Sequence, residues 1–176
     1  GIGVDDLIIF TGGKIKRKKK IELLINAFKL IKSTLVQLVI VGDTNNNVYK
    51  NELLALIAND SRIHFIGWVD GLEVYDYLCA ADVAVFPYGQ TVLWQQAIGT
   101  GLPLILGQHP GQDASYLNKN NNILLIGANE LSAERICKEL TSLYKNKEKL
   151  FSMKMAAKKT AIDFLSYEKI AQQTLE

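Results

Sequence analysis

The residues that could cross-link the chain or hold a metal ion are few. Among 176 residues there are two cysteines and two histidines. Cys79 and Cys137 lie far apart and lack the spacing of metal ligands, so we expect idle or buried thiols in a reducing compartment. His64 and His109 form no ligand cluster, and the sequence predicts no metal site.

Long apolar runs and a strong charge imbalance are also absent. No stretch approaches the roughly 20 apolar residues of a membrane-spanning helix, and the first ten residues do not resemble a signal peptide. The net charge is +2, with 48% hydrophobic and 22% charged residues, which are the proportions of a globular domain. The length lies within the range of about 100 to 200 residues for one domain. We therefore expect residues 1–176 to form a single domain.

Short apolar runs alternate with amphipathic segments along the chain. This alternation predicts an α/β fold, a doubly wound parallel sheet with helices on both faces. Six strands are expected at residues 7–11, 37–41, 63–66, 82–86, 103–106 and 123–125, and helices between them at residues 21–31, 49–57, 71–79, 92–98 and 113–117. After the sheet, three more helices are expected at residues 131–144, 149–164 and 167–174.

Residues 80–103 carry the most informative pattern, a strand followed by a tight turn and a helix start. Residues 82–87 are apolar and rich in β-branched side chains, as in a buried parallel strand. Residues 87–89 end the strand, and a polar helix start follows. The free N–H groups near Thr91 and Val92 would face the ligand edge of the sheet and suit a phosphate. The same geometry also fits an ordinary strand–helix connection.

A second stretch, residues 10–28, also passes from strand to helix and carries a cationic cluster. Its basic residues are Lys14, Lys16, Arg17, Lys18, Lys19 and Lys20. Such a run is often a solvated face or a nucleic-acid patch, but no aromatic side chains interleave with it to stack bases. Because it follows a strand end, where open α/β sheets bind ligands, we expect one or two lysines to meet an anionic ligand.

Together these stretches resemble the C-terminal, donor-nucleotide-binding half of a retaining GT-B glycosyltransferase of the glycosyl transferases group 1. The likeness covers nearly the whole chain and depends on the order and spacing of short blocks. These blocks are Gly13-Lys14, Lys19-Lys20, Asn26-Ala27-Phe28, Gly42-Asp43, Phe65 with Gly67 and Val69, Ala81-Asp82-Val83 with Pro87, and Gln96-Ala97 with Gly101-Leu102-Pro103. The sequence of residues 87–103 is similar to the corresponding block in a subset of bacterial capsule and exopolysaccharide transferases.

The resemblance implies a nucleoside diphosphate sugar as donor, a UDP-sugar or GDP-sugar, and no metal or other cofactor. Lys14 and Lys19 would contact the diphosphate, and Gln96 would bind the ribose. Trp68 and Val69 would lie along the base. The full set of residues expected at the donor site is Gly13, Lys14, Lys19, Gly42, Trp68, Val69, Tyr88, Gln90, Thr91, Val92 and Gln96.

Two departures from the family pattern concern this site. Members usually carry two glutamates with seven residues between them, and a gapless match places Tyr88 and Gln96 at those positions. An amide can still donate to and accept from a ribose hydroxyl. The first glutamate's role, close to the donor sugar, falls to Tyr88, to Gln90 or to no residue. Lys14 replaces an arginine, which keeps the charge and loses the bidentate fork.

The resemblance also implies a wider setting. GT-B enzymes hold the acceptor with an N-terminal domain, so we expect this chain to be excised from a two-domain enzyme and nearly inactive alone. The acceptor would be a polysaccharide or a lipid-linked sugar, with no nucleic acid involved. The expected location is cytoplasmic, with peripheral contact between the full-length enzyme and the inner face of the membrane.

Two other functions remain open at this point. An epimerase acting on a nucleotide sugar can share this fold, although the loss of both glutamates disfavours it. A non-catalytic module that binds nucleotide sugars would explain the same loss as decay of the donor site. Trp94 is expected in the core because an indole at this helical spacing buries a large area. His109 is either close to the donor sugar or a plain loop residue.

Overall fold

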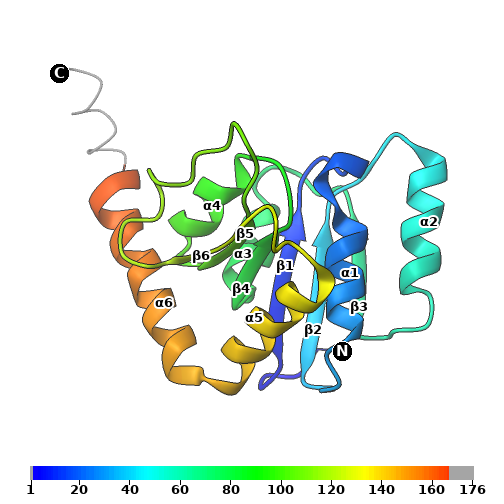
Figure 1. The fold of residues 1–176 in the computed structure, drawn as a ribbon, viewed down its shortest axis with the longest axis horizontal. Coiled ribbons are helices and arrows are strands. Elements are labelled where there is room, and N and C mark those ends of the chain that lie inside the picture. Colours follow the sequence, from blue (N-terminus) through cyan, green and yellow to red (C-terminus); the bar gives the residue numbers. More distant parts are fainter. Residues whose placement is uncertain (1, 167–176) are drawn as a thin grey trace.

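Six parallel strands form the centre of the protein (Figure 1), and the computed structural model describes residues 2–166. The strands are β1 (Leu7–Gly12), β2 (Val36–Val41), β3 (Ile63–Gly67), β4 (Val83–Phe86), β5 (Leu104–Gly107) and β6 (Ile123–Ile126). They are arranged in the order β3-β2-β1-β4-β5-β6, and all five neighbouring pairs are parallel. The prediction of a doubly wound, Rossmann-like sheet is confirmed.

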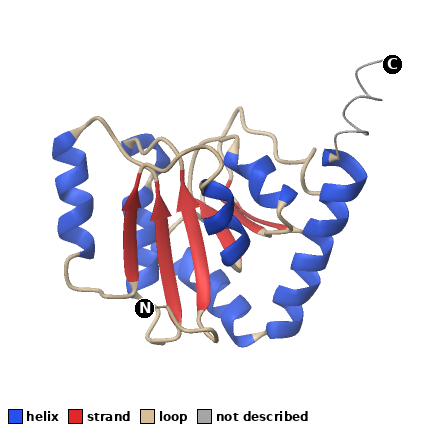
Figure 2. Cartoon of the chain, turned by 180° about the vertical axis from the view of Figure 1, so that it is seen from behind, coloured by secondary structure: helices blue, strands red, loops and turns tan. Residues whose placement is uncertain are grey.

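Helices cover both faces of the sheet, as Figures 1 and 2 show from opposite sides. They are α1 (Ile21–Lys29), α2 (Asn47–Ile57), α3 (Val74–Ala80), α4 (Leu93–Gly99), α5 (Ala133–Lys145) and α6 (Lys147–Thr160). One apolar core joins alternate strand residues to α1, α2 and α5, and the other joins the opposite residues to α3 and α4. Burial on both faces explains why β4 is apolar throughout and why Gln37 is the one polar residue of β2.

Asp82, just before β4, fastens the long helix α6 to the sheet. Its Oδ1 accepts a hydrogen bond from Nζ of Lys154 at 2.5 Å, and its Oδ2 accepts one from the Ile8 N–H at 2.8 Å. One carboxylate therefore connects α6, β1 and the start of β4. After α6 the backbone continues as a π-helical segment, η2 (Ala161–Leu165).

Most strand and helix predictions agree with the structure to within two or three residues, with one clear error. The helix predicted at residues 113–117 is absent, and the chain there forms a single turn in which the Ala114 carbonyl accepts from the N–H groups of Leu117 and Asn118. The helix predicted at residues 167–174 lies outside the described residues. No helix within residues 2–166 has the length and apolar character needed to cross a lipid bilayer.

The central pair of strands, β1 and β4, is also where the direction of the strand order reverses. Only Ile9–Val83 and Phe10–Ala84 are in register across this pair, whereas β1 and β2 share six register pairs. In open α/β sheets, ligands bind beyond the carboxyl ends of the strands at such a reversal. A ligand site is therefore expected at the loops after β1 and β4.

Candidate functional site

Two glycines bring the loops after β1 and β2 into direct backbone contact. Gly42 has φ +142°, and a Cβ atom there would lie 2.0 Å from the Gly13 carbonyl oxygen. Gly13 has φ +94°, and its N–H donates to the Val41 carbonyl at 2.8 Å. Both backbone conformations favour glycine, and the approach at Gly42 leaves no room for a side chain. The result is a bare backbone surface at the sheet's carboxyl edge.

A hollow of about 280 Å³ lies over this surface, and we call it the apolar lobe. It includes most residues that the sequence places at a donor site, together with five that the sequence did not place there, Val41, Asp70, Gly71, Val74 and Leu93. Its walls are Gly13, Lys14, Val41, Gly42, Trp68, Val69, Asp70, Gly71, Val74, Thr91, Val92, Leu93 and Gln96. Each of the five lies within five residues of a predicted donor-site residue along the chain, and this proximity is the signal that could have identified them.

Trp68 and Gln96 give the apolar lobe its recognition groups. The Trp68 side chain is 68% exposed at the end of β3, so its ring is free to stack on a planar ligand. Gln96, on α4, donates from Nε2 to the Tyr75 hydroxyl at 3.3 Å. This contact orients the amide and leaves its Oε1 able to accept from a ligand hydroxyl.

A second hollow of about 370 Å³ adjoins the first, and we call it the cationic lobe. It is lined by Lys14, Lys16, Lys18, Lys19, Tyr88, Gly89, Gln90, Thr91 and His109. Lys14 and Thr91 line both lobes, so the two hollows adjoin at these residues. The donor-site residues predicted from sequence therefore divide between an apolar and a cationic compartment.

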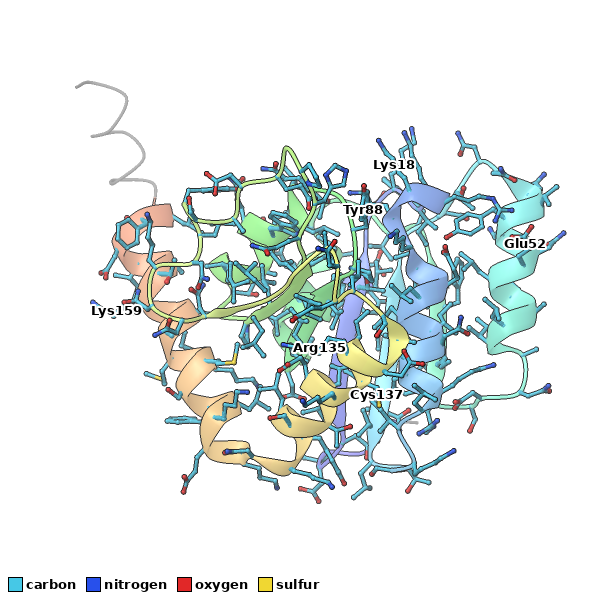
Figure 3. All side chains as sticks on the ribbon, viewed as in Figure 1. Lys18, Glu52, Tyr88, Arg135, Cys137 and Lys159 are labelled. Atoms are coloured by element: carbon cyan, nitrogen blue, oxygen red, sulfur yellow. The ribbon has the colours of Figure 1, made fainter. Side chains whose placement is uncertain are left out.

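Four lysines line the cationic lobe, more than the one or two that the sequence led us to expect. The remaining two basic residues of the cluster, Arg17 and Lys20, contact other side chains. Arg17 forms an ion pair with Glu52 of α2 at 2.6 Å, and Lys20 lies over the Tyr88 ring, 4.7 Å from its centroid. Figure 3 shows Lys18 and Tyr88 at the same end of the molecule.

Lys19 is the best anchored of these lysines. It lies at the end of η1 (Arg17–Lys19), and its Nζ donates to the carbonyl oxygens of Gln90 at 2.8 Å and Gly89 at 3.2 Å. Burial lowers the pKa of Lys19, and the nearby charges of Lys18 and Lys16 lower it further. An anion bound in the lobe would oppose both effects.

Tyr88 and His109 form the aromatic wall of the cationic lobe. Their ring centroids lie 4.1 Å apart, with the planes tilted by 56°. The Tyr88 ring is thus in contact with His109 and, as noted above, with Lys20. The sequence did not decide whether His109 lies near the ligand, and the structure places it in the lining of the cationic lobe. Trp94 is 1% exposed and belongs to the core, as predicted.

The start of α4 supplies backbone donors at the junction of the lobes. The helix begins at Leu93, whose N–H donates to Oγ1 of Thr91 at 3.4 Å. Within residues 2–166, the backbone N–H groups of Thr91 and Val92 donate no hydrogen bond. These two groups can therefore donate to a ligand, as the sequence pattern indicated.

The fold and the reversal of strand order define a Rossmann-like α/β domain with a ligand edge at β1 and β4. Among protein families, Glycosyl transferases group 1 matches residues 5–146. The chain belongs to this family, and its fold is that of the C-terminal domain of a GT-B glycosyltransferase. A search of curated proteins gave no match.

Several solved structures share this fold. HepE of Anabaena, crystallised in complex with UDP, is 17% identical with a TM-score of 0.83, over 97% of this chain and 48% of HepE. WaaG, a glycosyltransferase involved in lipopolysaccharide biosynthesis, is 20% identical with a TM-score of 0.79, over 98% of this chain and 47% of WaaG. The chain thus spans about half the length of these two proteins.

A third structure matches this chain over most of both lengths. It is the C-terminal domain of a glycosyl transferase group 1 family protein, LpcC, from Francisella tularensis. It is 18% identical with a TM-score of 0.78, and the match covers 92% of this chain and 87% of that one. At these identities, the three likenesses establish the shared fold.

Proposed function

We propose that this chain is the donor-binding half of a retaining hexosyltransferase, with a UDP-sugar or GDP-sugar as donor. The observation that carries the proposal is that the two lobes adjoin at Lys14 and Thr91. A largely apolar groove with an exposed indole lies next to a compartment lined by four lysines. This is the order of polarity along a nucleoside diphosphate, from base through ribose to diphosphate.

In this proposal the apolar lobe binds the nucleoside. The Trp68 ring and Val69 lie along the base, and backbone groups around Gly13 and Gly42 allow the ligand to approach closely. Gln96 accepts from a ribose hydroxyl through Oε1, while its Nε2 is held by Tyr75. The neutral amide of Gln96 thus stands where other family members have a carboxylate. Its acceptor oxygen is already oriented towards the ligand.

The cationic lobe would supply the catalytic stabilisation. Transfer breaks the bond between the anomeric carbon and a phosphate oxygen, so negative charge grows on the leaving diphosphate. Lys14 and Lys19, together with Lys16 and Lys18, stabilise that charge more strongly in the transition state than in the ground state. These fixed charges remove the need for a bound metal or other cofactor in the proposed reaction.

The sugar end of the donor would lie near Gln90 and Tyr88. The Gln90 side chain is exposed on the cationic lobe, while its carbonyl oxygen is held by Lys19. Tyr88 presents its ring face to Lys20 and His109, so its main contribution is the shape of the wall. We assign Gln90 the position beside the donor sugar that a family glutamate occupies.

The proposal extends to the wider enzyme. Residues 1–176 act as one donor-binding domain, and a second domain supplies the acceptor, a capsular or other bacterial polysaccharide or a lipid-linked sugar. The full-length enzyme works in the cytoplasm, at the inner face of the membrane, and the isolated domain transfers little sugar. The shared fold of HepE, crystallised with UDP, and of WaaG, a glycosyltransferase involved in lipopolysaccharide biosynthesis, supports the donor-binding part of this proposal.

Calorimetry of the chain with UDP, GDP and uridine tests the proposal. We expect one of the diphosphates to bind at least tenfold more tightly than its nucleoside, because each charged contact to phosphate contributes on the order of 1.5 to 3 kcal/mol. Replacing Lys16 and Lys18 together by alanine should remove much of this difference. Replacing Lys138 and Lys145 together by alanine, at exposed positions on α5 outside both lobes, is the matched control. Equal affinities for nucleoside and diphosphate would contradict the proposal.

A further inference from the structure

Large apolar side chains form a row on the exposed side of α6 and η2. Phe151 is 66% exposed, Met155 48% and Ile162 70%. Spacings of four and seven residues place these three on one face of a helix, over a length of about 16 Å at 1.5 Å per residue. None of the three belongs to either apolar core. The packing of the fold therefore leaves their exposure unexplained.

The inner face of α6 attaches this helix to the domain. Leu150 and Met153 join the core that includes α5, and Ala157 joins the core that includes α4. In Figures 1 and 2, α6 lies at one side of the molecule. Within residues 2–166, the outer face of α6 is thus available to a partner.

Lysines accompany the apolar row. The segment 147–165 holds five lysines and two acidic residues, a surplus of three positive charges in a chain whose net charge is +2. Lys147, four residues before Phe151, and Lys158, three residues after Met155, are exposed and share the face of the row by helical spacing. Neither lysine forms an ion pair within residues 2–166. We define the α6 face as Lys147, Phe151, Met155, Lys158 and Ile162.

Acidic side chains balance the positive charge of this segment only in part. Asp163 pairs with Lys159 at 2.8 Å, and Figure 3 shows Lys159 on the outer side of α6. Asp82, from the start of β4, pairs with Lys154. Glu148 is the other acidic residue of the segment and is exposed. The α6 face therefore keeps a net positive charge beside its apolar side chains.

An exposed helix face of this composition fits the surface of a bilayer that contains anionic lipids. Apolar side chains enter the boundary between headgroups and acyl chains, and lysines attract the anionic headgroups. A protein partner would instead contact about 20 to 30 residues on each side, which is far more than one row on one helix offers. We infer that the α6 face docks on an anionic lipid surface.

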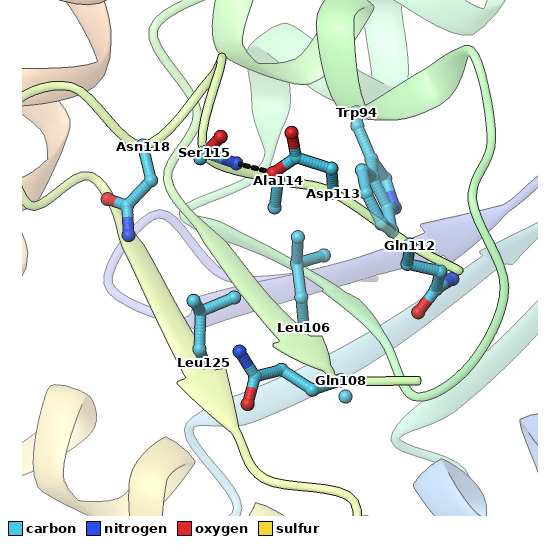
Figure 4. Close-up of a pocket in the computed structure, with 10 residues that line it drawn as sticks. Trp94, Leu106, Gln108, Gln112, Asp113, Ala114, Ser115, Asn118 and Leu125 are labelled. Carbon is cyan, nitrogen blue, oxygen red and sulfur yellow. Dashed lines mark hydrogen bonds between the residues drawn. The ribbon is translucent and has the colours of Figure 1, made fainter. Parts of the chain in front are cut away.

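This docking leaves the proposed donor site accessible. No residue of the α6 face lines the apolar lobe, the cationic lobe or the pocket at the ends of β5 and β6 that Figure 4 shows. A nucleotide can therefore enter from water while α6 lies on lipid. The inference deepens the proposed function, on which it rests for the location at a membrane, and it involves none of the donor-site residues.

Flotation with lipid vesicles tests the inference. The chain should float with vesicles that contain phosphatidylglycerol and stay unbound with phosphatidylcholine alone. Phe151→Ser combined with Met155→Ser should weaken binding at least tenfold, because the apolar side chains no longer enter the bilayer. Val48→Ser combined with Leu54→Ser, at two exposed positions on α2, is the matched control and should have no effect.

The charge of the α6 face is tested separately. Lys147→Ala combined with Lys158→Ala should weaken binding to the anionic vesicles about ten- to thirtyfold, since each lysine near such a surface contributes severalfold. Lys16→Ala combined with Lys18→Ala removes the same charge from the cationic lobe and should leave vesicle binding unchanged. Binding of UDP or GDP should respond in the opposite way to the two pairs of substitutions.

Indole fluorescence reports whether the face enters the bilayer. Trp68 and Trp94 are the only tryptophans, and Trp94 is 1% exposed beside the interior pocket of Figure 4, so vesicles should not alter its emission. In a Trp68→Phe background, Phe151→Trp should give emission that shifts to shorter wavelength when anionic vesicles are added. Val48→Trp in the same background should give no shift.

Several results would overturn the inference. Unchanged flotation of the double serine variant of α6 would mean that another surface binds the lipid. Absence of binding to anionic vesicles, or equal binding to phosphatidylcholine alone, would remove the anionic lipid as partner. Dimers in sedimentation that the serine variant abolishes would mean that the face contacts a second copy of the chain. Should that variant fail to fold, Phe151→Ser alone serves in its place. Failure of UDP and GDP to bind would contradict the proposed donor site and leave the flotation result standing.

Discussion

The ammonium group of Lys19 donates to the carbonyl oxygen of Gln90 at 2.8 Å, across 71 residues of sequence. This bond connects the end of η1 to the loop between β4 and α4. The same ammonium lines the cationic lobe, so one side chain both holds the loop in place and presents charge to a ligand. Its removal should therefore affect ligand binding and the loop together.

Lys19→Ala should weaken binding of UDP or GDP, whichever binds, by severalfold or more. The variant loses a charged contact to phosphate and the tether to the Gly89–Gln90 carbonyls. Calorimetry measures the change, with Lys138→Ala as the control for loss of one positive charge at a distance. Thermal unfolding of both variants checks that the fold is intact. An affinity equal to that of the wild type would remove Lys19 from the site.

The effect of Lys19→Ala should also depend on pH. Burial and neighbouring lysines lower the pKa of Lys19 in the free protein, and a bound diphosphate raises it. The contribution of Lys19 to binding is therefore complete below the lowered pKa of the free protein and disappears as the pH rises through the higher pKa of the complex. The ratio of wild-type to variant affinity, measured from neutral to alkaline pH, should fall towards one. A ratio independent of pH would mean that the charge of Lys19 is not involved.

Gln96 provides a test of ribose binding. Gln96→Glu should be tolerated because it restores the family residue, whereas Gln96→Leu leaves a ribose hydroxyl without a partner. That cost is about 1 to 3 kcal/mol, so the leucine variant should bind the nucleotide roughly five- to a hundredfold more weakly. Gln95→Leu, at the exposed neighbouring position, is the control. No loss in Gln96→Leu, measured on the full-length enzyme, would favour a decayed donor site.

The close approach of two loops predicts a structural effect of Gly42→Ala. Its Cβ would lie 2.0 Å from the Gly13 carbonyl oxygen, at φ +142°. We expect destabilisation by about 2 kcal/mol or more, since the loops must separate. Gly127→Ala is the control, because its Cβ would have no neighbour within 4 Å. The midpoints of urea unfolding measure both changes, and equal midpoints would show that the loops separate without cost.

The sequence predicted the sheet well because its strands are buried on both faces. A continuous apolar run such as β4 predicts a buried strand without any knowledge of its neighbours. The wrong helix at residues 113–117 has a local cause. One buried residue, Leu117, and a turn around the Ala114 carbonyl imitate a short amphipathic segment that lacks a second turn. At α2, the Asn46 side chain caps the Tyr49 N–H and starts the helix two residues earlier than expected.

The division of the site into two lobes could not be predicted from sequence. Which basic residues enter the cationic lobe depends on partners distant in sequence, as the Arg17–Glu52 ion pair shows. The exposure of Trp68 follows from its position just after the end of β3.

The short β1–β4 pairing has a consequence for cooperativity. With only two register pairs at the centre, the sheet consists of two halves, β1–β3 and β4–β6, joined by its shortest ladder. Lys14 lies in the loop after β1, which belongs to the first half, and Thr91 lies in the loop after β4, which belongs to the second. A nucleotide bound at both would act as a cross-link between two folding units, so amide hydrogen exchange along β1 and β4 should slow most when the donor binds.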